Sequence, residues 1–296
     1  MLLVRPALAE TLRLATWNAG LDRAGPGLLL HDILSDDDAQ VAAVVQVIVA
    51  LDADVLLLTG VDYDHGLVAL QALDARLGNG YPTRFALRPN TGMATGLDID
   101  GDGRLGSPRD AMGWGRFAGE GGMAILSRLP IDEAGVRDLS ALLWRDLPGA
   151  ILPPGFPETH AAVQRLSTTG HWLVPLILPG GGTLTLMVWH ATPPVFDGPE
   201  DRNGRRNHDE AALWLRLLDG SLGPSRKPLL SSSATAIWTR WMARGGGKRC
   251  RRCCRIRRCR TQGQRARMGG SSLRTRAIPA SIPRCTTPAR GGCGWT

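Results

Sequence analysis

The sequence predicts one domain of mixed α and β structure, of the α/β or α+β class, over residues 12–227 of the 296-residue chain. Short apolar runs typical of strands alternate with stretches in which apolar residues recur at helical spacing. No run of about 18 apolar residues occurs, so no transmembrane helix is expected. After residue 227 the periodicity stops and the composition changes.

The first elements are expected in the order strand, helix, strand. Leu12–Trp17 has the pattern of a strand, which Asn18-Ala-Gly ends. Ser35 and Asp38 form a predicted capping box. The helix that follows is marked by apolar residues at helical spacing: Val41, Val44, Val45, Ile48 and Val49. The continuous apolar run Val55–Leu58 is typical of a buried strand.

The later elements include a long loop. Residues 90–122 are rich in Gly and Asp, and this predicts a functional or metal-ordered loop. Ala211, Leu215 and Leu218 share one side of the last predicted helix. The other expected elements are a helix at Leu67–Leu77, strands at Thr83–Leu87 and Met123–Leu126, a hairpin of His171–Leu178 with Leu184–Trp189, and a helix at Asn207–Leu218.

Charge and cysteine divide the chain near residue 227. Residues 1–225 hold 17 Arg and 27 acidic residues, whereas residues 226–296 hold 16 Arg, 2 Lys, no acid and all six Cys, for a total net charge of +8. No stretch of the second part could bury enough apolar surface to offset its ordering entropy. We therefore predict a disordered basic Arg/Cys-rich tail at 228–296.

Residues 1–11 have two interpretations. Ala7-Leu8-Ala9 resembles a signal-peptide cleavage site, so the segment could be the remnant of a secretory signal, implying a periplasmic or secreted protein. The alternative is a disordered leader on a cytoplasmic protein.

Four patches carry a resemblance to a known family. They are Ala15-Thr-Trp-Asn18, the apolar run Asp54–Leu58, the segment Gly122-Met-Ala-Ile-Leu-Ser-Arg-Leu-Pro-Ile131, and Trp189-His190. Their order and spacing resemble the endonuclease/exonuclease/phosphatase family, with a deoxyribonuclease-I-like fold. The resemblance implies an α+β fold, a four-layer α/β/β/α sandwich, and hydrolysis of phosphoesters with Mg²⁺ (or Mn²⁺).

The resemblance also implies roles for two residues. His190 matches the family's catalytic histidine and would bind a phosphoryl oxygen or move a proton. Asn18 matches the family's first-strand asparagine, which helps to hold the carboxylates or the phosphate. Without the resemblance, Asn18 would simply end a strand.

The chain departs from the family pattern at the metal site. The family places a glutamate ligand directly after the apolar run, where this chain has Thr59-Gly60. Asp62 and Asp64 follow closely and could bind the cation from a shifted backbone; otherwise they are ordinary turn acids.

A second departure lies downstream. The family continues with an apolar strand ending in Gly-Asp-x-Asn and closes with an Asp-His pair, and neither motif occurs in the tail. A frameshift between Pro228 and Ser231 explains this most simply, because an out-of-frame GC-rich gene yields Arg, Gly, Pro, Ser, Cys and Trp. The domain would then be incomplete at its C-terminal end. The rivals are an evolved tail that binds nucleic acid and a weak zinc site at Cys250-x-x-Cys253.

Two further groups could bind ions. Asp98, Asp100 and Asp102 with Gly103 match the first half of a calcium loop, although Arg109 occupies its twelfth position. This predicts structural Ca²⁺, or else a solvated acidic turn. Arg202, Arg205 and Arg206 could hold substrate phosphate, or else form salt bridges at a helix N-terminus.

The sequence therefore predicts a divalent-metal-dependent phosphoester hydrolase, impaired in this chain. Its substrate would be a nucleic acid or a small phosphomonoester. The acidic body argues against tight duplex binding. The alternatives are a catalytically dead family member and a protein that binds nucleic acid through the tail. The sequence predicts no oligomeric state.

Overall fold

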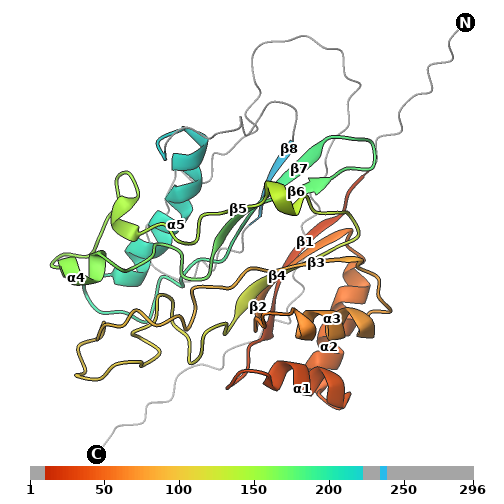
Figure 1. The fold of residues 1–296 in the computed structure, drawn as a ribbon, viewed down its shortest axis with the longest axis horizontal. Helices are drawn as coiled ribbons and strands as arrows, with labels where there is room; N and C mark the ends of the chain where they lie inside the picture. The colour runs from red at the N-terminus through yellow and green to blue at the C-terminus, as the bar shows by residue number, and fades with distance from the viewer. Residues whose placement is uncertain (1–10, 223–233, 239–296) are drawn as a thin grey trace, which may run out of the picture. The chain divides into compact units, whose positions relative to one another are not determined.

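The computed structural model describes residues 11–222 and the backbone of residues 234–238, and every helix and strand lies within one compact unit, Leu12–Lys248. Two four-stranded sheets form its centre (Figure 1). No helix in the described part is long and apolar enough to cross a membrane.

The first sheet has the strand order β1-β2-β4-β3. β1 pairs with β2 in parallel, whereas β4 pairs with β2 and with β3 in antiparallel fashion. β2 is buried along its whole length, as its continuous apolar run predicts. The strands are β1 (Leu14–Leu21), β2 (Val55–Val61), β3 (Thr83–Phe85) and β4 (Gly122–Ser127).

The second sheet has the order β5-β6-β7-β8. β6 and β7 form the predicted hairpin, and β8 pairs in parallel with β7. A parallel neighbour requires a crossover, and α5 (Arg202–Leu218) lies between β7 and β8 in the chain. The strands are β5 (Arg137–Asp138), β6 (His171–Ile177), β7 (Thr183–Trp189) and β8 (Ala234–Trp238).

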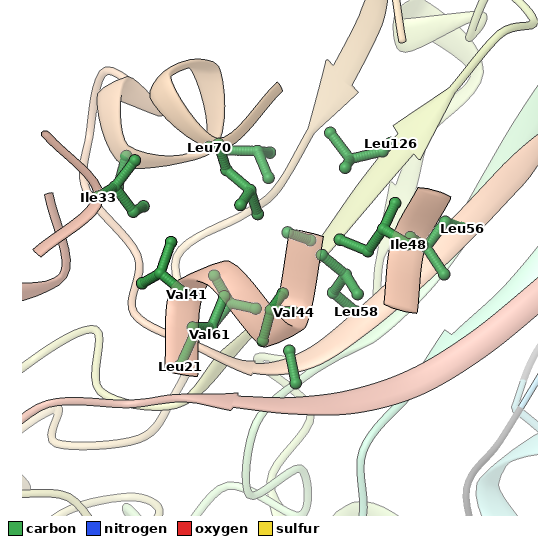
Figure 2. Close-up of a cluster of buried hydrophobic side chains, with 14 of the residues drawn as sticks. Leu21, Ile33, Val41, Val44, Ile48, Leu56, Leu58, Val61, Leu70 and Leu126 are labelled. Atoms are coloured by element: carbon green, nitrogen blue, oxygen red, sulfur yellow. The ribbon is translucent and has the colours of Figure 1, made fainter. Parts of the chain in front are cut away.

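Three helices cover the outer face of the first sheet. They are α1 (Leu28–Ser35), α2 (Ala39–Leu51) and α3 (Val68–Arg76). Val44 and Ile48 of α2 pack in one buried cluster with Leu56 and Leu58 of β2 (Figure 2). Alternate residues of a strand face opposite sides, so Val55 and Leu57 of β2 point into the second cluster, between the sheets.

The second sheet contributes to the inter-sheet cluster and to a third cluster on its outer face. Leu186 and Val188 of β7 join the inter-sheet cluster, whereas Met187 packs with Leu213 and Trp214 of α5. The remaining short elements are η1 (Glu133–Gly135), η2 (Trp144–Asp146) and α4 (Glu158–Ala161). The order helix, sheet, sheet, helix confirms the expected α+β four-layer sandwich.

Two sequence predictions differ from the structure locally. Ser35 is not the N-cap of α2: it ends α1, a helix that the sequence did not predict, and its hydroxyl donates to the carbonyl of Asp32 (3.0 Å). Asp38 caps α2 instead, because its carboxylate accepts from the amide of Val41 (2.7 Å).

The second difference concerns the C-terminal part. Ala234–Trp238 forms β8, although disorder was predicted from residue 228. The open edge of β7 offers backbone partners that composition alone does not reveal. The rest of the predicted tail, and residues 1–10 of the leader predicted at 1–11, lie outside the described residues.

Residues 90–121 form the predicted long loop, and close backbone approaches hold it together. The Gly92 amide donates to the carbonyl of Gly113 (2.9 Å), and the Asn90 side-chain amide donates to the carbonyls of Ser140 (2.8 Å) and Ser167 (2.7 Å). These bonds fix the loop beside the sheet ends.

Candidate active site

One cleft of about 1130 Å³ contains the two candidate catalytic residues. Asn18 comes from β1 of the first sheet, and His190 directly follows β7 of the second sheet. The two residues thus line the same cleft, although they are 172 positions apart in the sequence. The cleft is also lined by Asp22, Glu120, Thr168, Thr192, Arg202 and Asn207.

The loop after His190 is fastened to α5. Asn207 donates a side-chain hydrogen bond to the carbonyl of Thr192 (2.7 Å). Glu210, which is fully buried, accepts hydrogen bonds from the amides of Thr168 (2.6 Å) and Thr192 (2.7 Å). One carboxylate thus joins two cleft-lining segments and fixes the backbone that leads away from His190.

Burial raises the pKa of Glu210 to about 7, against the opposing effects of Arg206 and the two amides. A buried carboxylate is costly in its charged form, so burial keeps a proton on Glu210 up to about pH 7. Sequence reasoning missed this residue, because a glutamate on an amphipathic helix is normally exposed.

The structure places Asp62 and Asp64 outside the cleft. The Asp62 carboxylate accepts from the amides of Arg23 (2.9 Å) and Gly121 (2.9 Å), and burial raises its pKa to about 6. Asp64 accepts from the amides of Val68 (2.7 Å) and Ala69 (3.0 Å) at the start of α3. Both carboxylates accept from backbone amides, and neither side chain lines the cleft that contains His190.

Asp22 and Glu120 are the acids that line the cleft near Asn18, and sequence reasoning missed both. Asp22 is exposed, whereas Glu120 is buried and forms an ion pair with Arg116. Arg116 donates from its Nε to Glu120 (2.8 Å). The only sequence signal was position, because Asp22 follows β1 and Glu120 precedes β4.

The sequence matches a known protein family over most of its length. The model of the Endonuclease/Exonuclease/phosphatase family matches residues 15–230. The chain belongs to this family. No curated protein matches.

Several solved structures are similar at low identity. One is an endonuclease/exonuclease/phosphatase from Beutenbergia cavernae DSM 12333, with 17% identity and a TM-score of 0.39, covering 70% of this chain and 43% of that one. Another is humanized D. rerio TDP2, with 12% identity and a TM-score of 0.35, covering 77% and 65%. A third is ANGEL2, a 2′,3′-cyclic phosphatase, with 13% identity and a TM-score of 0.36, covering 76% and 52%. The chain thus spans roughly half to two thirds of their lengths.

The resemblance would place the family's glutamate ligand at Gly60, and the local backbone leaves little room for a side chain there. The φ of Gly60 is +67°, and a Cβ there would lie 2.7 Å from Oδ1 of Asn18. The strand pairing between β1 and β2 also shifts register at this point. A side chain at position 60 would therefore displace Asn18 from its place in the cleft.

Gly60→Ala is expected to lower the free energy of unfolding by about 1–3 kcal/mol more than Gly78→Ala. Gly78 has a similar φ of +74° but nothing within 4 Å of a Cβ, so it controls for backbone strain alone. Urea unfolding of both variants measures the difference. Equal losses would show that contact with Asn18 contributes nothing.

The three candidate phosphate-binding arginines lie in different surroundings. Arg206 is buried and donates to the carbonyls of Leu166 (2.9 Å) and Met112 (2.6 Å), and burial lowers its pKa to about 10. Arg202 lines the cleft and donates to Gln164 (2.8 Å). Arg205 does not line the cleft, and its Nε donates to the Glu200 carbonyl (3.1 Å). Of the three, Arg202 has the position that best suits a ligand in the cleft.

Asp98, Asp100 and Asp102 come together as their spacing predicts. Within residues 11–222 this is the one group of three acidic or imidazole side chains whose ligand atoms lie within 4.8 Å of one another. Asp98 also accepts from the amides of Gly101 (2.7 Å) and Gly103 (2.8 Å), and Asp110 accepts from Ile99 (2.7 Å). Asp100 lines the edge of the cleft.

Proposed function

We propose that this chain is a phosphoester hydrolase whose reaction takes place beside Asn18 and His190. The carrying observation is that these residues, from different sheets, line one cleft in a member of the endonuclease/exonuclease/phosphatase family. His190 would donate a hydrogen bond to a phosphoryl oxygen or transfer a proton. Asn18 would orient the phosphate through its amide.

A divalent cation such as Mg²⁺ or Mn²⁺ would supply neutralisation of the phosphoryl charge in such a reaction. The described cleft does not offer a full set of ligands for it. Glu120 is engaged by Arg116, and among the described residues Asp22 belongs to no group of three acidic or imidazole side chains whose ligand atoms lie within 4.8 Å of one another. Outside the described residues the chain contains a single acid, Glu10, so the rest of the chain does not supply a missing set of carboxylates and the activity would be impaired.

His190→Ala is expected to lower turnover of p-nitrophenyl phosphate or plasmid DNA by about 100-fold or more, because it removes the proton-transfer group. Turnover should need Mg²⁺ and stop in EDTA. His31→Ala is the matched control, since His31 is exposed and lies outside the cleft. Turnover that persists in EDTA, or that His190→Ala leaves unchanged, would contradict the proposal.

We also propose that the activity is impaired by a one-base frameshift just before the tail. In the shifted frame, each new codon consists of the last base of one present codon and the first two bases of the next. If Ser231, Ser232 and Ser233 have codons of the TCN type, this frame encodes three apolar residues there. The codons that overlap Ser233 to Ile237 then permit Gly-Asp-x-Asn. This is the apolar strand and motif that the resemblance leads one to expect.

Single-codon residues strengthen this interpretation. Trp is encoded only by TGG and Met only by ATG, so Trp238-Thr239 and Trp241-Met242 must each encode Asp in the shifted frame. The tail itself contains no acidic residue. Sequencing the coding DNA around codons 226–240 tests the proposal. Serine codons of the AGY type at 231–233, or another base pattern without Gly-Asp-x-Asn, would exclude it and favour a selected basic tail.

We further propose that Asp98, Asp100 and Asp102 bind Ca²⁺, because alternating carboxylates around a glycine turn suit a hard cation. Saturating Ca²⁺ is then expected to raise the unfolding temperature by several degrees, since ligands of the native state stabilise it. Asp100→Asn should abolish most of that rise, whereas Asp36→Asn, at an exposed residue outside the cluster, should not. An unfolding temperature that does not change when Ca²⁺ is added would refute the assignment.

A further inference from the structure

We propose that the cleft recognises a substrate with an unstacked nucleobase, which Trp114 and Phe196 bind by stacking. The inference rests on the proposed function and names its substrate class as single-stranded nucleic acid or a nucleotide. Of the aromatic side chains described by the structure, only Trp114 and Phe196 are exposed, by 57% and 89%. Both line the cleft that contains His190.

Trp114 is exposed on a backbone that is held firmly on both sides. A Cβ on Gly113 would lie 2.2 Å from the carbonyl oxygen of Thr168, and one on Gly115 would lie 2.6 Å from the amide nitrogen of Gly92. The chain therefore packs tightly against other backbone immediately before and after the indole. A ring displayed from so constrained a backbone loses little conformational entropy when a ligand stacks on it.

Phe196 is presented in a similar way by the loop after His190. Its φ is +70°, which is strained for a bulky residue and is often found at binding sites. Asn203 of α5 holds both neighbours, because its side chain donates to the Val195 carbonyl (2.7 Å) and its amide donates to the Asp197 carboxylate. The loop thus keeps an apolar ring in solvent at a cost in strain and hydration.

Phe156, the third aromatic ring of the cleft, already has partners. It packs edge-on against Trp144 (5.8 Å between centroids), and the Arg202 guanidinium lies over it (5.7 Å). Trp114 and Phe196 show no such ring or cation contact among the described residues. Their faces are therefore the ones available to a ligand.

The charges of the cleft favour a base over a bare polyanion. Five acids line it against three arginines, so its net charge is negative and phosphate alone is not strongly favoured. The acids are Asp22, Asp100, Glu120, Asp197 and Glu200, and the arginines are Arg109, Arg202 and Arg206. Stacking does not depend on charge, and the side chain of Arg109, which lines the cleft, offers donors to the edge of a heterocycle. Bases in a duplex are already stacked and paired, so only an unpaired base can enter.

The test compares two fluorescein-labelled strands of equal length and charge, one of normal thymidines and one of abasic sites. Binding to the full chain is followed by anisotropy in EDTA, so that no strand is cleaved. We expect the base-containing strand to bind about 5- to 100-fold more tightly. Trp114→Ala and Phe196→Ala should each lower that ratio toward 1. Leu105→Ala is the control, because Leu105 is 71% exposed on the same long loop but does not line the cleft.

Equal affinity for both strands would overturn the inference, since phosphate alone would then account for binding. A preference that neither variant reduces would also overturn it, because another surface would be recognising the bases. Failure of hydrolysis refutes only the proposed function, as this readout requires no turnover. The two proposals can therefore fail separately.

Discussion

Replacing Gly92 with alanine is expected to destabilise the protein by about 4 kcal/mol or more, the range reached when a substitution forces backbone apart. Gly92 has a φ of +68°, and a Cβ there would lie 1.7 Å from the carbonyl oxygen of Phe117. No rotamer can relieve this contact, because the backbone fixes the position of the Cβ and the carbonyl oxygen belongs to the main chain. The long loop would have to open between its two halves.

Gly96→Ala is the matched control on the same loop. Its φ is +79°, yet nothing lies within 4 Å of a Cβ, so it isolates the conformational cost of alanine. Urea unfolding of both variants gives the difference in the free energy of unfolding. Similar losses for the two variants would mean that the close approach at Gly92 does not hold the loop.

The second large effect is a loss of stability in acid caused by His171. This ring is fully buried; its Nε2 donates to the Glu210 carbonyl (2.9 Å), and its Nδ1 accepts from the Ser167 hydroxyl (2.6 Å). Burial lowers its pKa from 6.5 to about 3. Between pH 6.5 and about 3 the unfolded chain binds a proton at this imidazole and the folded chain does not. The free energy of unfolding therefore falls as the pH drops through this range. The full effect is about 5 kcal/mol.

Glu210 acts in the opposite direction. Its folded pKa of about 7 lies above the ordinary value of 4.5. Its contribution to the free energy of unfolding is therefore complete below pH 4.5 and is lost as the pH rises through 7. The loss is about 3 kcal/mol. The two groups oppose each other between pH 4.5 and 6.5. Of these two groups, only His171 changes the free energy of unfolding below pH 4.5.

Single variants separate the two contributions. The free energy of unfolding of His171→Gln should fall less steeply in acid than that of the wild type, and that of Glu210→Gln should decline less steeply toward pH 7. The pH slope is the readout, since either variant also loses packing. Parallel slopes in wild type and His171→Gln would show that the buried imidazole does not govern acid stability.

Most of the sheet strands could be predicted from the sequence, because continuous apolar runs such as Val55–Leu58 and the hairpin of β6 and β7 are local patterns. The strand order could not, since it depends on contacts between distant segments. The buried side of α5 was also misjudged. Ala211, Leu215 and Leu218 were expected to share the apolar side, whereas Leu213, Trp214 and Leu217 are the buried apolar residues.

The candidate site was predicted in part for a similar reason. Asn18 was expected to end its strand but lies within β1, which continues to Leu21, whereas His190 directly follows β7. Both residues lie toward the ends of strands, and strand ends converge at a sheet edge. Asp62 has the right residue type near the expected metal position, but its partners are the amides of Arg23 and Gly121. Those partners are 39 and 59 positions away, so no local pattern reveals that its oxygens are engaged.

Each sheet is built mainly from one continuous stretch of chain, and this has a consequence for synthesis. Residues 14–127 complete the first sheet and its helices, but the inner face with Val55, Leu57 and Ile125 is covered mainly by residues from β6 and β7. A ribosome needs roughly 3 to 12 seconds to add the chain between β4 and the end of β7. During that interval the nascent protein displays a flat apolar surface. A chaperone that binds near the exit tunnel would find its target there.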